Sequence, residues 1–310
     1  MKKKILVFAV TFFALPFYIS TFLSASNTGA SFLSIGTSAR AISMGSAYVG
    51  VANDVSAINY NPAGLSQVKE SQLMGQHTEW ISDIKHDFLA FTRPTLNGTM
   101  GLSVIYLSQD SIEGRDENRQ RTGSFNAYDV ATTLSYSTVI LSETKNPVSI
   151  GTNIKIIQQK IESESATGVA VDIGTQYDTS INNLKLGLSF QNIGPKMTFI
   201  QEGYNLPLTA TIGLGYTLKR AITFALDIKR KVYDNKTEIL LGTEVTPISL
   251  LALRLGYLKS VNPETISSIS NFKGIGGGLG LKINKFSTDY AFVPYGDLGN
   301  THRLSFGVKF

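Results

Sequence analysis

The sequence predicts an all-β fold, a transmembrane antiparallel β-barrel of about 14 strands with an N-terminal segment in its lumen. From about residue 71 onward, segments of about ten residues alternate apolar and polar side chains and are separated by turn residues. Many apolar faces end in aromatic residues, as expected where strands cross lipid headgroups. The chain stops on Phe310, at the end of one such strand. A soluble sandwich also alternates, but these features favour the barrel.

The first 26 residues predict a secretory signal peptide. Lys2, Lys3 and Lys4 precede an apolar run over residues 5–23, and small residues at 24–26 follow it. A retained membrane-spanning helix is the rival interpretation, because the run approaches the length that crosses a bilayer. Pro16 and the small residues favour cleavage just before Asn27. The chain is therefore expected to be exported.

Net charge and cysteine content exclude several classes of protein. The formal net charge of +5 would lose three lysines with the signal peptide, so the pI of about 9.2 indicates no nucleic-acid partner. The chain has no cysteine, which rules out disulfide bonds in an exported protein. Stability is expected to come from a large packed or hydrogen-bonded framework.

Residues 27–69 predict a plug for the barrel. The stretch 36–65 is rich in Gly, Ala and Ser, is almost uncharged and is too small-sided to build its own core. It closes on Asn61, Pro62, Ala63 and Gly64, where proline fixes φ and glycine permits a turn that most residues cannot make. We expect these four residues to form a stiff turn that hands the chain to the first strand, and they are the candidates for gating.

Residues 70–310 predict the barrel. Turns near residues 142–147, 178–183, 219–220 and 247–249 are short, whereas the stretches 109–123, 195–207 and 259–273 are predicted as long loops. Short periplasmic turns and longer outward loops are typical of outer-membrane barrels. Phe310 resembles the terminal aromatic signal that outer-membrane assembly machinery reads.

No residue set predicts catalysis, a cofactor or a metal ion. His77 and His86 could approach one another across a hairpin, which makes a lipid hydrolase an alternative, but no nucleophile motif accompanies them. The glycine run at residues 274–280 leads into a strand, so it is not a phosphate-binding loop and is expected to allow barrel curvature or close approach of lumen contents. The polar faces carry charges of nearly balanced sign, which are expected to pair and pack a closed lumen: Lys155, Asp172, Lys185, Asp227, Lys229, Glu238, Glu244, Arg254, Lys282, Asp289 and Arg303.

Four segments resemble a known family. Residues 32–65, 187–197, 206–216 and 289–310 are similar to the PorV/PorQ family of outer-membrane barrels, which is related to the FadL-type long-chain fatty-acid transporters. The resemblance implies a 14-stranded FadL-type barrel whose Asn-Pro-Ala element, here Asn61 to Ala63, belongs to the plug.

Two functions remain open. The first is passage of a hydrophobic small molecule across the outer membrane through the plugged lumen. The second, implied by the likeness to PorV, is a non-transporting component of a type IX-like secretion or surface-attachment system. A general diffusion porin is a weaker third possibility. The expected partners are outer-membrane lipids, the assembly machinery, and a hydrophobic ligand or secretion proteins.

Overall fold

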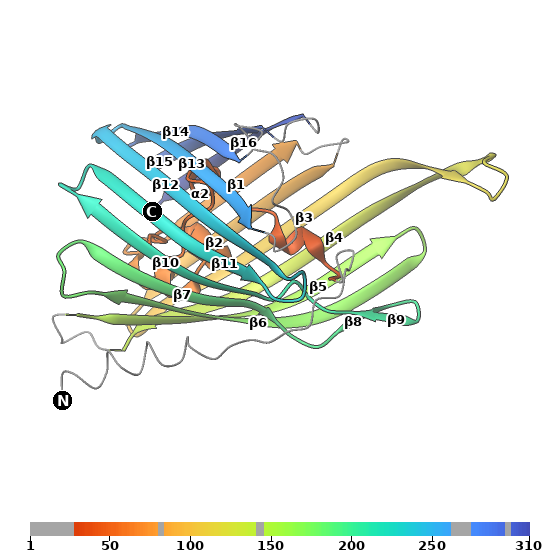
Figure 1. The fold of residues 1–310 in the computed structure, drawn as a ribbon, viewed down its shortest axis with the longest axis horizontal. Helices are drawn as coiled ribbons and strands as arrows, with labels where there is room; N and C mark the ends of the chain where they lie inside the picture. Colours follow the sequence, from red (N-terminus) through yellow and green to blue (C-terminus); the bar gives the residue numbers. More distant parts are fainter. Residues whose placement is uncertain (1–27, 80–83, 141–145, 262–273, 295–298) are drawn as a thin grey trace.

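The computed structural model describes residues 28–79, 84–140, 146–261, 274–294 and 299–310, and the predicted signal peptide lies outside them. Fourteen strands close into one antiparallel barrel, in which β10 follows β7 around the wall and β16 pairs with β1 (Figure 1). The prediction of an all-β barrel of about 14 strands is confirmed. The barrel strands are β1 (Gln72–Glu79), β2 (Lys85–Thr95), β3 (Gly98–Arg115), β4 (Arg121–Val139), β5 (Val148–Ile161), β6 (Glu164–Asp178), β7 (Leu184–Ile193), β10 (Thr209–Leu218), β11 (Ile222–Lys231), β12 (Lys236–Ile248), β13 (Leu251–Val261), β14 (Ile275–Ile283), β15 (Phe286–Pro294) and β16 (Asn300–Lys309).

The alternation of side chains separates the two faces of the wall. On β4, Leu134 and Tyr136 are 53% and 40% exposed, whereas Thr133 and Ser135 between them are buried. Successive residues of a strand point to opposite faces, so one slip in register would reverse every side chain. The outer face is consequently an apolar surface suited to lipid. No helix among the described residues is long and apolar enough to cross a membrane.

The two ends of the barrel differ. At one end the strands are joined by brief turns such as 219–221, 249–250 and 284–285, and β1 begins and β16 finishes there; we call it the short-turn end. The opposite end, the long-loop end, carries the connection 194–208 and the longest hairpin. The short turns agree with the prediction, whereas the predicted loop 259–273 lies outside the described residues except for 259–261, which end β13.

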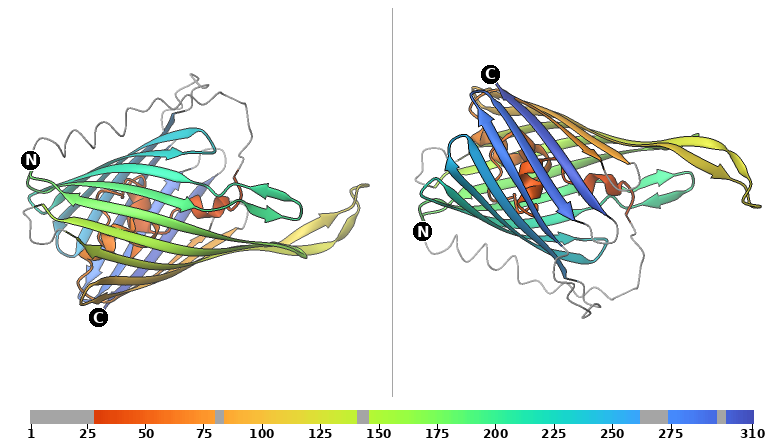
Figure 2. Two further views of the ribbon diagram at one scale, coloured as in Figure 1. Left: turned by 90° about the horizontal axis from the view of Figure 1, so that it is seen from below. Right: turned by 90° about the horizontal axis from the view of Figure 1, so that it is seen from above.

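Two stretches predicted as loops contain strands instead. Over residues 109–123, β3 and β4 continue to pair and form an arm that projects beyond the barrel (Figure 2). Its turn is held by Asp116, whose Oδ1 accepts from the backbone N–H groups of Asn118 and Gln120 at 2.9 and 2.8 Å. The charged residues there misled the prediction, because a strand pair exposed on both faces is as polar as a loop. The stretch 195–207 likewise holds a separate hairpin, β8 (Met197–Phe199) with β9 (Glu202–Tyr204).

The last strand closes the barrel. β16 pairs with β1 from Gln72 to Glu79, and the N–H of Phe310 donates to the carbonyl of Ser71 at 3.0 Å. The Phe310 ring is 60% exposed and stacks on Phe91 of β2, with ring centroids 6.0 Å apart. Phe310 therefore lies on the outer face at the closing seam.

Candidate functional site

The N-terminal segment runs through the lumen from one end of the barrel to the other. Thr28 contacts the long-loop end, where it bridges to Asn205 and its hydroxyl donates to Asp234. The chain then forms η1 (Ser31–Ser34), α2 (Ala39–Ser43), η2 (Val55–Asn59) and η3 (Pro62–Gln67) before β1 begins at Gln72 at the short-turn end. Helix α2 contacts β13 to β16, η2 contacts β1 to β3, and η3 contacts β3 to β6. We call residues 28–71 the plug.

Short polar side chains start the helical turns of the plug. Ser38 caps α2 by accepting from the N–H of Ala41, and Asp54 caps η2 by accepting from the N–H of Ser56. Each cap satisfies a backbone donor that a helix start leaves unpaired. In a segment with so few large apolar side chains, these caps fix where each turn begins.

Asn61, Pro62, Ala63 and Gly64 lie together against the barrel wall, and all four are buried. The Asn61 amide donates to the carbonyls of Val49 and Thr175, each at 3.0 Å, and its Oδ1 accepts from the N–H of Ala63 at 3.2 Å. The tetrapeptide thus ties the plug to itself and to β6. It opens η3, with proline in the first turn, instead of leading directly into β1 as predicted.

The reason for glycine at position 64 differs from the prediction. Its φ lies outside the left-handed region, so the turn itself does not demand glycine. A Cβ on Gly64 would lie 2.4 Å from the carbonyl oxygen of Ala52, which is closer than real Cβ contacts. Close packing within the plug therefore requires glycine here.

Inward-facing glycines of the wall let the plug backbone approach the strands. A Cβ on Gly151 would lie 2.3 Å from the carbonyl carbon of Pro62, and one on Gly256 would lie 1.9 Å from the nitrogen of Gly45. Only a residue without a side chain fits such contacts. We call the inward-facing glycines that lie against plug atoms, of the backbone or of side chains, the glycine belt: Gly101, Gly151, Gly174, Gly187, Gly213, Gly215, Gly242, Gly256 and Gly278. Gly278 belongs to the run at 274–280, so close approach of lumen contents, one of the two predicted reasons for glycine there, applies to it.

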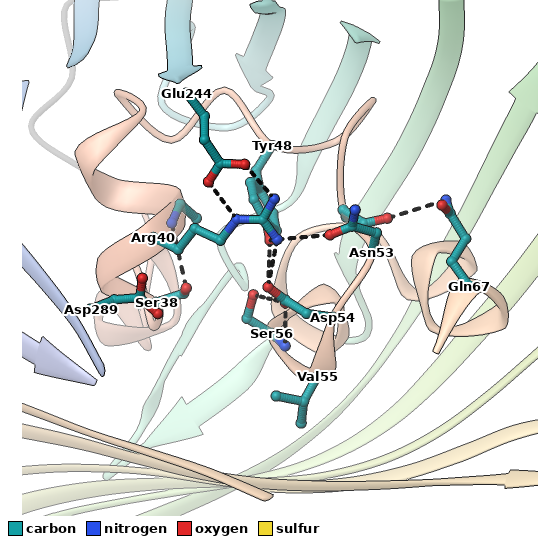
Figure 3. Close-up of polar contacts among 12 residues, drawn as sticks. Ser38, Arg40, Tyr48, Asn53, Asp54, Val55, Ser56, Gln67, Glu244 and Asp289 are labelled. Carbon is teal, nitrogen blue, oxygen red and sulfur yellow. Dashed lines mark hydrogen bonds and ion pairs between the residues drawn. The ribbon is translucent and has the colours of Figure 1, made fainter. Parts of the chain in front are cut away.

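A charged network joins α2 to the wall on the short-turn side (Figure 3). Arg40 holds Glu244 of β12 through two contacts, from Nε at 2.9 Å and from Nη2 at 2.8 Å. Its Nη1 also donates to Asp54 at 2.9 Å, to Tyr48 at 2.9 Å and to Asn53 at 2.7 Å. Such a two-pronged guanidinium–carboxylate pair fixes geometry as well as charge. Arg40 therefore links its own helix α2, Tyr48 and the Asn53–Asp54 turn to strand β12.

The network continues along the wall. Arg254 of β13 donates from Nε to Glu244 at 2.6 Å and from Nη1 to Asp289 of β15 at 2.7 Å. Two arginines and three carboxylates are thus mutually paired. Lys155 pairs with Asp172 at 2.8 Å in the same way on β5 and β6. These contacts agree with the expectation that lumen charges pair.

The environment shifts the pKa values of titratable groups in the plug. Burial opposes ionisation of Asp54, but the charge of Arg40 and the hydrogen bonds from Ser56, Tyr48 and Arg40 together outweigh it, so the pKa of this carboxyl is lowered. Burial raises the pKa of the Tyr60 hydroxyl to about 12. Asp54 and Arg40 are consequently an ion pair near neutral pH, and Tyr60 remains a neutral hydrogen-bonding group.

A second carboxylate holds the plug backbone directly. Asp227 of β11 is buried, and its Oδ2 accepts from the N–H groups of Tyr48 and Val49 at 2.7 and 2.8 Å. The sequence placed Asp227 in the lumen but gave no sign of this role. It also passed over Arg40 and Asp54, although a lone arginine in an almost uncharged stretch was a signal that could have found them.

The structure does not bring His77 and His86 together. His77 and His86 sit on neighbouring strands but on opposite faces, His77 being exposed and His86 buried. His77 contacts Asp87 at 2.6 Å on the exposed face. Across the described part of the chain, no cluster of histidine and acidic residues could hold a metal ion.

The sequence matches the Uncharacterised protein family (UPF0164) over residues 23–309. The chain belongs to this family. A UPF0164 protein of Treponema pallidum (strain Nichols) is 23% identical over 286 residues, which are 86% of this chain and 65% of that protein. The chain thus spans less than two thirds of that relative's length.

Several solved structures share the fold. The TodX deltaS2S3 mutant monoaromatic hydrocarbon channel superposes with a TM-score of 0.64 at 14% identity, covering 89% of this chain and 99% of that one. The CymD monoaromatic hydrocarbon channel gives 0.64 at 10% identity, covering 89% and 98%. A Pseudomonas aeruginosa FadL homologue gives 0.56 at 10% identity, covering 94% and 99%. The FadL-type barrel is confirmed, while the finer likeness to PorV and PorQ stays a prediction.

Proposed function

We propose that this protein sits in the outer membrane and passes a small apolar molecule through its plugged lumen. The short-turn end faces the periplasm and the long-loop end faces outward, as in other barrels of this class. The protein performs no catalysis and uses no cofactor. Part of the plug shifts to open the path.

The observation that carries this proposal is the apolar inner surface at the long-loop end. Side chains of the strands and of the connection 194–208 pack there on apolar side chains at the start of the plug, and together they form a lining that a polar solute would not need. Its members are Phe32, Leu33, Ile35, Phe88, Ile105, Leu107, Ile157, Met197, Phe199, Leu206, Leu240 and Leu258. The likeness to two monoaromatic hydrocarbon channels is consistent with an apolar cargo.

The plug is the barrier that such a cargo meets next. Below the apolar lining, the plug packs on the glycine belt, and the Arg40 network fastens it to β12. An apolar molecule would not replace these ion pairs and hydrogen bonds favourably. Passage therefore requires displacement of plug residues, and the Asn61 to Gly64 tetrapeptide is the gating candidate.

A reversible tether tests the displacement. The hydroxyls of Ser66 in η3 and Ser149 in β5 are 2.8 Å apart, and the natural chain has no cysteine. In the S66C/S149C variant a disulfide would fix the plug to the wall. Uptake of labelled toluene and of labelled long-chain fatty acid into proteoliposomes is expected to fall on oxidation and to recover on reduction.

Two outcomes would contradict the proposal. If wild-type proteoliposomes take up these probes no faster than protein-free liposomes, transport is refuted. If the oxidised variant matches the reduced one and the single-cysteine controls, movement of the plug at η3 is refuted.

A second candidate is a non-transporting component of a secretion or surface-attachment system. Two features favour it: the tight fit of the plug in the glycine belt, and the β3–β4 arm with the neighbouring β8–β9 hairpin, which project from the long-loop end (Figure 2). Such hairpins offer exposed edges to a protein partner. Co-purification of a stoichiometric protein that is lost when residues 110–124 are replaced by a short turn, together with absent uptake, would favour this role.

A further inference from the structure

A cavity of about 320 Å³ opens between the plug and β12 to β16 at the short-turn end. Its inner part is formed by the charged network, with Arg40, Asp54, Glu244, Arg254 and Asp289 in its lining. Its outer part includes Lys282, Lys285 and Lys309. This mouth lies at the opposite end of the lumen from the apolar lining.

Neighbouring strands bring the three lysines together. Lys282, the last residue but one of β14, lies opposite Ser287 of β15, and Ser287 pairs in turn with Gly307 of β16. The N–H of Lys309 donates to the backbone carbonyl of Lys285 at 2.9 Å. Lys282 and Lys309 occupy inward positions of the alternation, and Lys285 lies in the turn between β14 and β15.

The charges of the cavity do not balance. The carboxylates of Asp54, Glu244 and Asp289 are each within ion-pair distance of Arg40 or Arg254. No described carboxylate lies within 4.0 Å of the ammonium groups of the three lysines. Five cations and three anions line the cavity, and the excess of positive charge is concentrated at its mouth. Asp54 and Glu70 attract Lys309 only from beyond ion-pair distance, so the three lysines keep an excess of positive charge that favours binding of an anion.

The residue types at the mouth fit a phosphate group. Lysine binds phosphate as a flexible point charge, so three lysines can converge on a compact, highly charged group. Ser249 and Ser287 add hydroxyl groups to the lining. The volume is at the small end of the range for ligand sites, which suits a headgroup-sized anion.

The surroundings also reach the lipid-facing surface. Leu73 and Phe286, which are 38% and 65% exposed, belong to the lining of the same cavity. A phosphate at the mouth could therefore belong to a lipid whose chains lie along the outer face, or to a soluble organic phosphate.

We propose that the mouth of this cavity is a binding site for a phosphate group, held by Lys282, Lys285 and Lys309. The site is independent of the apolar passage. Its occupant adds negative charge where the fold has gathered unpaired cations, so it also stabilises the seam between β14, β15, β16 and the plug.

Calorimetric titration of the full mature chain in non-ionic micelles tests the site. The probes are soluble short-chain phosphatidylglycerol, short-chain phosphatidylcholine, glycerol 3-phosphate and inorganic phosphate. Binding of phosphatidylglycerol alone identifies a lipid headgroup, and binding of glycerol 3-phosphate or inorganic phosphate as well identifies a soluble phosphate. Binding of none of the anionic probes at low ionic strength overturns the proposal.

Matched variants locate the site. The K282Q/K285Q/K309Q variant is expected to lose affinity on the order of tenfold or more. The K69Q/K219Q/R220Q variant removes the same number of cations from the same end but outside the cavity lining, and it is expected to bind as the wild type does. Equal losses in the two variants would show that charge at this end acts non-specifically and would overturn the site.

Folding of the variants is checked separately. Because the substitution removes mutually repelling charges, the ligand-free K282Q/K285Q/K309Q protein is expected to unfold at the same temperature as the wild type or above it. A lower unfolding temperature without ligand would show that the lysines already have stabilising partners, which contradicts the proposal.

Discussion

Substitution of Gly256 by alanine should loosen the plug more than any comparable change in the wall. The new Cβ would lie 1.9 Å from the nitrogen of Gly45, and ordinary contact begins at 3.4 Å, so the plug must retreat by about 1.5 Å. Overpacking of this kind destabilises by about 1 to 3 kcal/mol. Alanine gains about 0.5 to 1 kcal/mol over glycine in a strand, which offsets part of the loss.

Gly277 supplies the matched control. It pairs with Leu255 of the adjacent strand β13, and a Cβ there would meet only the carbonyl of Arg254, at 3.5 Å. Gly277→Ala is therefore expected to be neutral or slightly stabilising. The free energy of unfolding of the two variants, from urea titrations in micelles, should differ by about 2 kcal/mol.

Tryptic cleavage after Arg40 gives a second readout. Arg40 is the only basic residue between positions 28 and 68, and in the folded protein it is held in the charged network. Cleavage there reports release of the plug even when the barrel stays closed. Gly256→Ala should accelerate it relative to Gly277→Ala. Identical unfolding midpoints and identical cleavage rates in the two variants would refute the close docking of plug and wall.

Four further predictions concern single residues. Arg40→Met should destabilise the protein by about 1.5 to 3 kcal/mol, because it leaves Glu244 less well paired. The double variant R40M/E244Q should recover part of this stability in a double-mutant cycle, whereas additive losses would contradict the pairing. Asn61→Ala removes three hydrogen bonds and should cost about 1 to 2 kcal/mol in urea unfolding, with an unchanged midpoint as the opposing result. The pKa of Asp54 is lower in the folded than in the unfolded chain, so the stability that its carboxylate contributes is present above about pH 4 and is lost as the pH falls. Asp54→Asn should therefore make the free energy of unfolding fall less steeply at acid pH than it does in the wild type. Equal slopes in the two proteins would count against this. Deletion of Phe310 should reduce surface levels of assembled barrel more than loss of any single lumen charge, and equal levels would disprove this.

The barrel strands could be predicted from the sequence because the pattern that marks them is local. Alternation with period two, as in Thr133, Leu134, Ser135 and Tyr136, assigns each side chain to a face without knowledge of its partners. The alternation ends in the β3–β4 arm, where no lipid or lumen distinguishes the faces. There the charged residues indicated a loop, and the prediction was wrong.

The sequence indicated that residues 27–69 form a plug, but it did not predict how the plug is arranged in the lumen. Small residues indicated that the segment needs a wall, yet its arrangement depends on contacts with residues far away in the chain. Arg40 reaches Glu244 across more than two hundred positions, and Asp227 accepts from the backbone of Tyr48 and Val49. Contacts of this kind produce no repeating pattern in the sequence around either residue. The stated reason for Gly64 failed similarly, because crowding by Ala52 is invisible in a local turn motif.

The path of the plug has a consequence for biogenesis. The polypeptide passes through the ring from Thr28 at one rim to Gln72 at the other and only then turns back to become the ring itself. A ring that closed first would have to be threaded by a free end. Pairing of β1 with β16 is therefore expected to be the last step of barrel assembly, after the other strands have formed around the plug. A folded domain fused ahead of Thr28 would stay outside the barrel at the long-loop end, because it could not pass through the lumen.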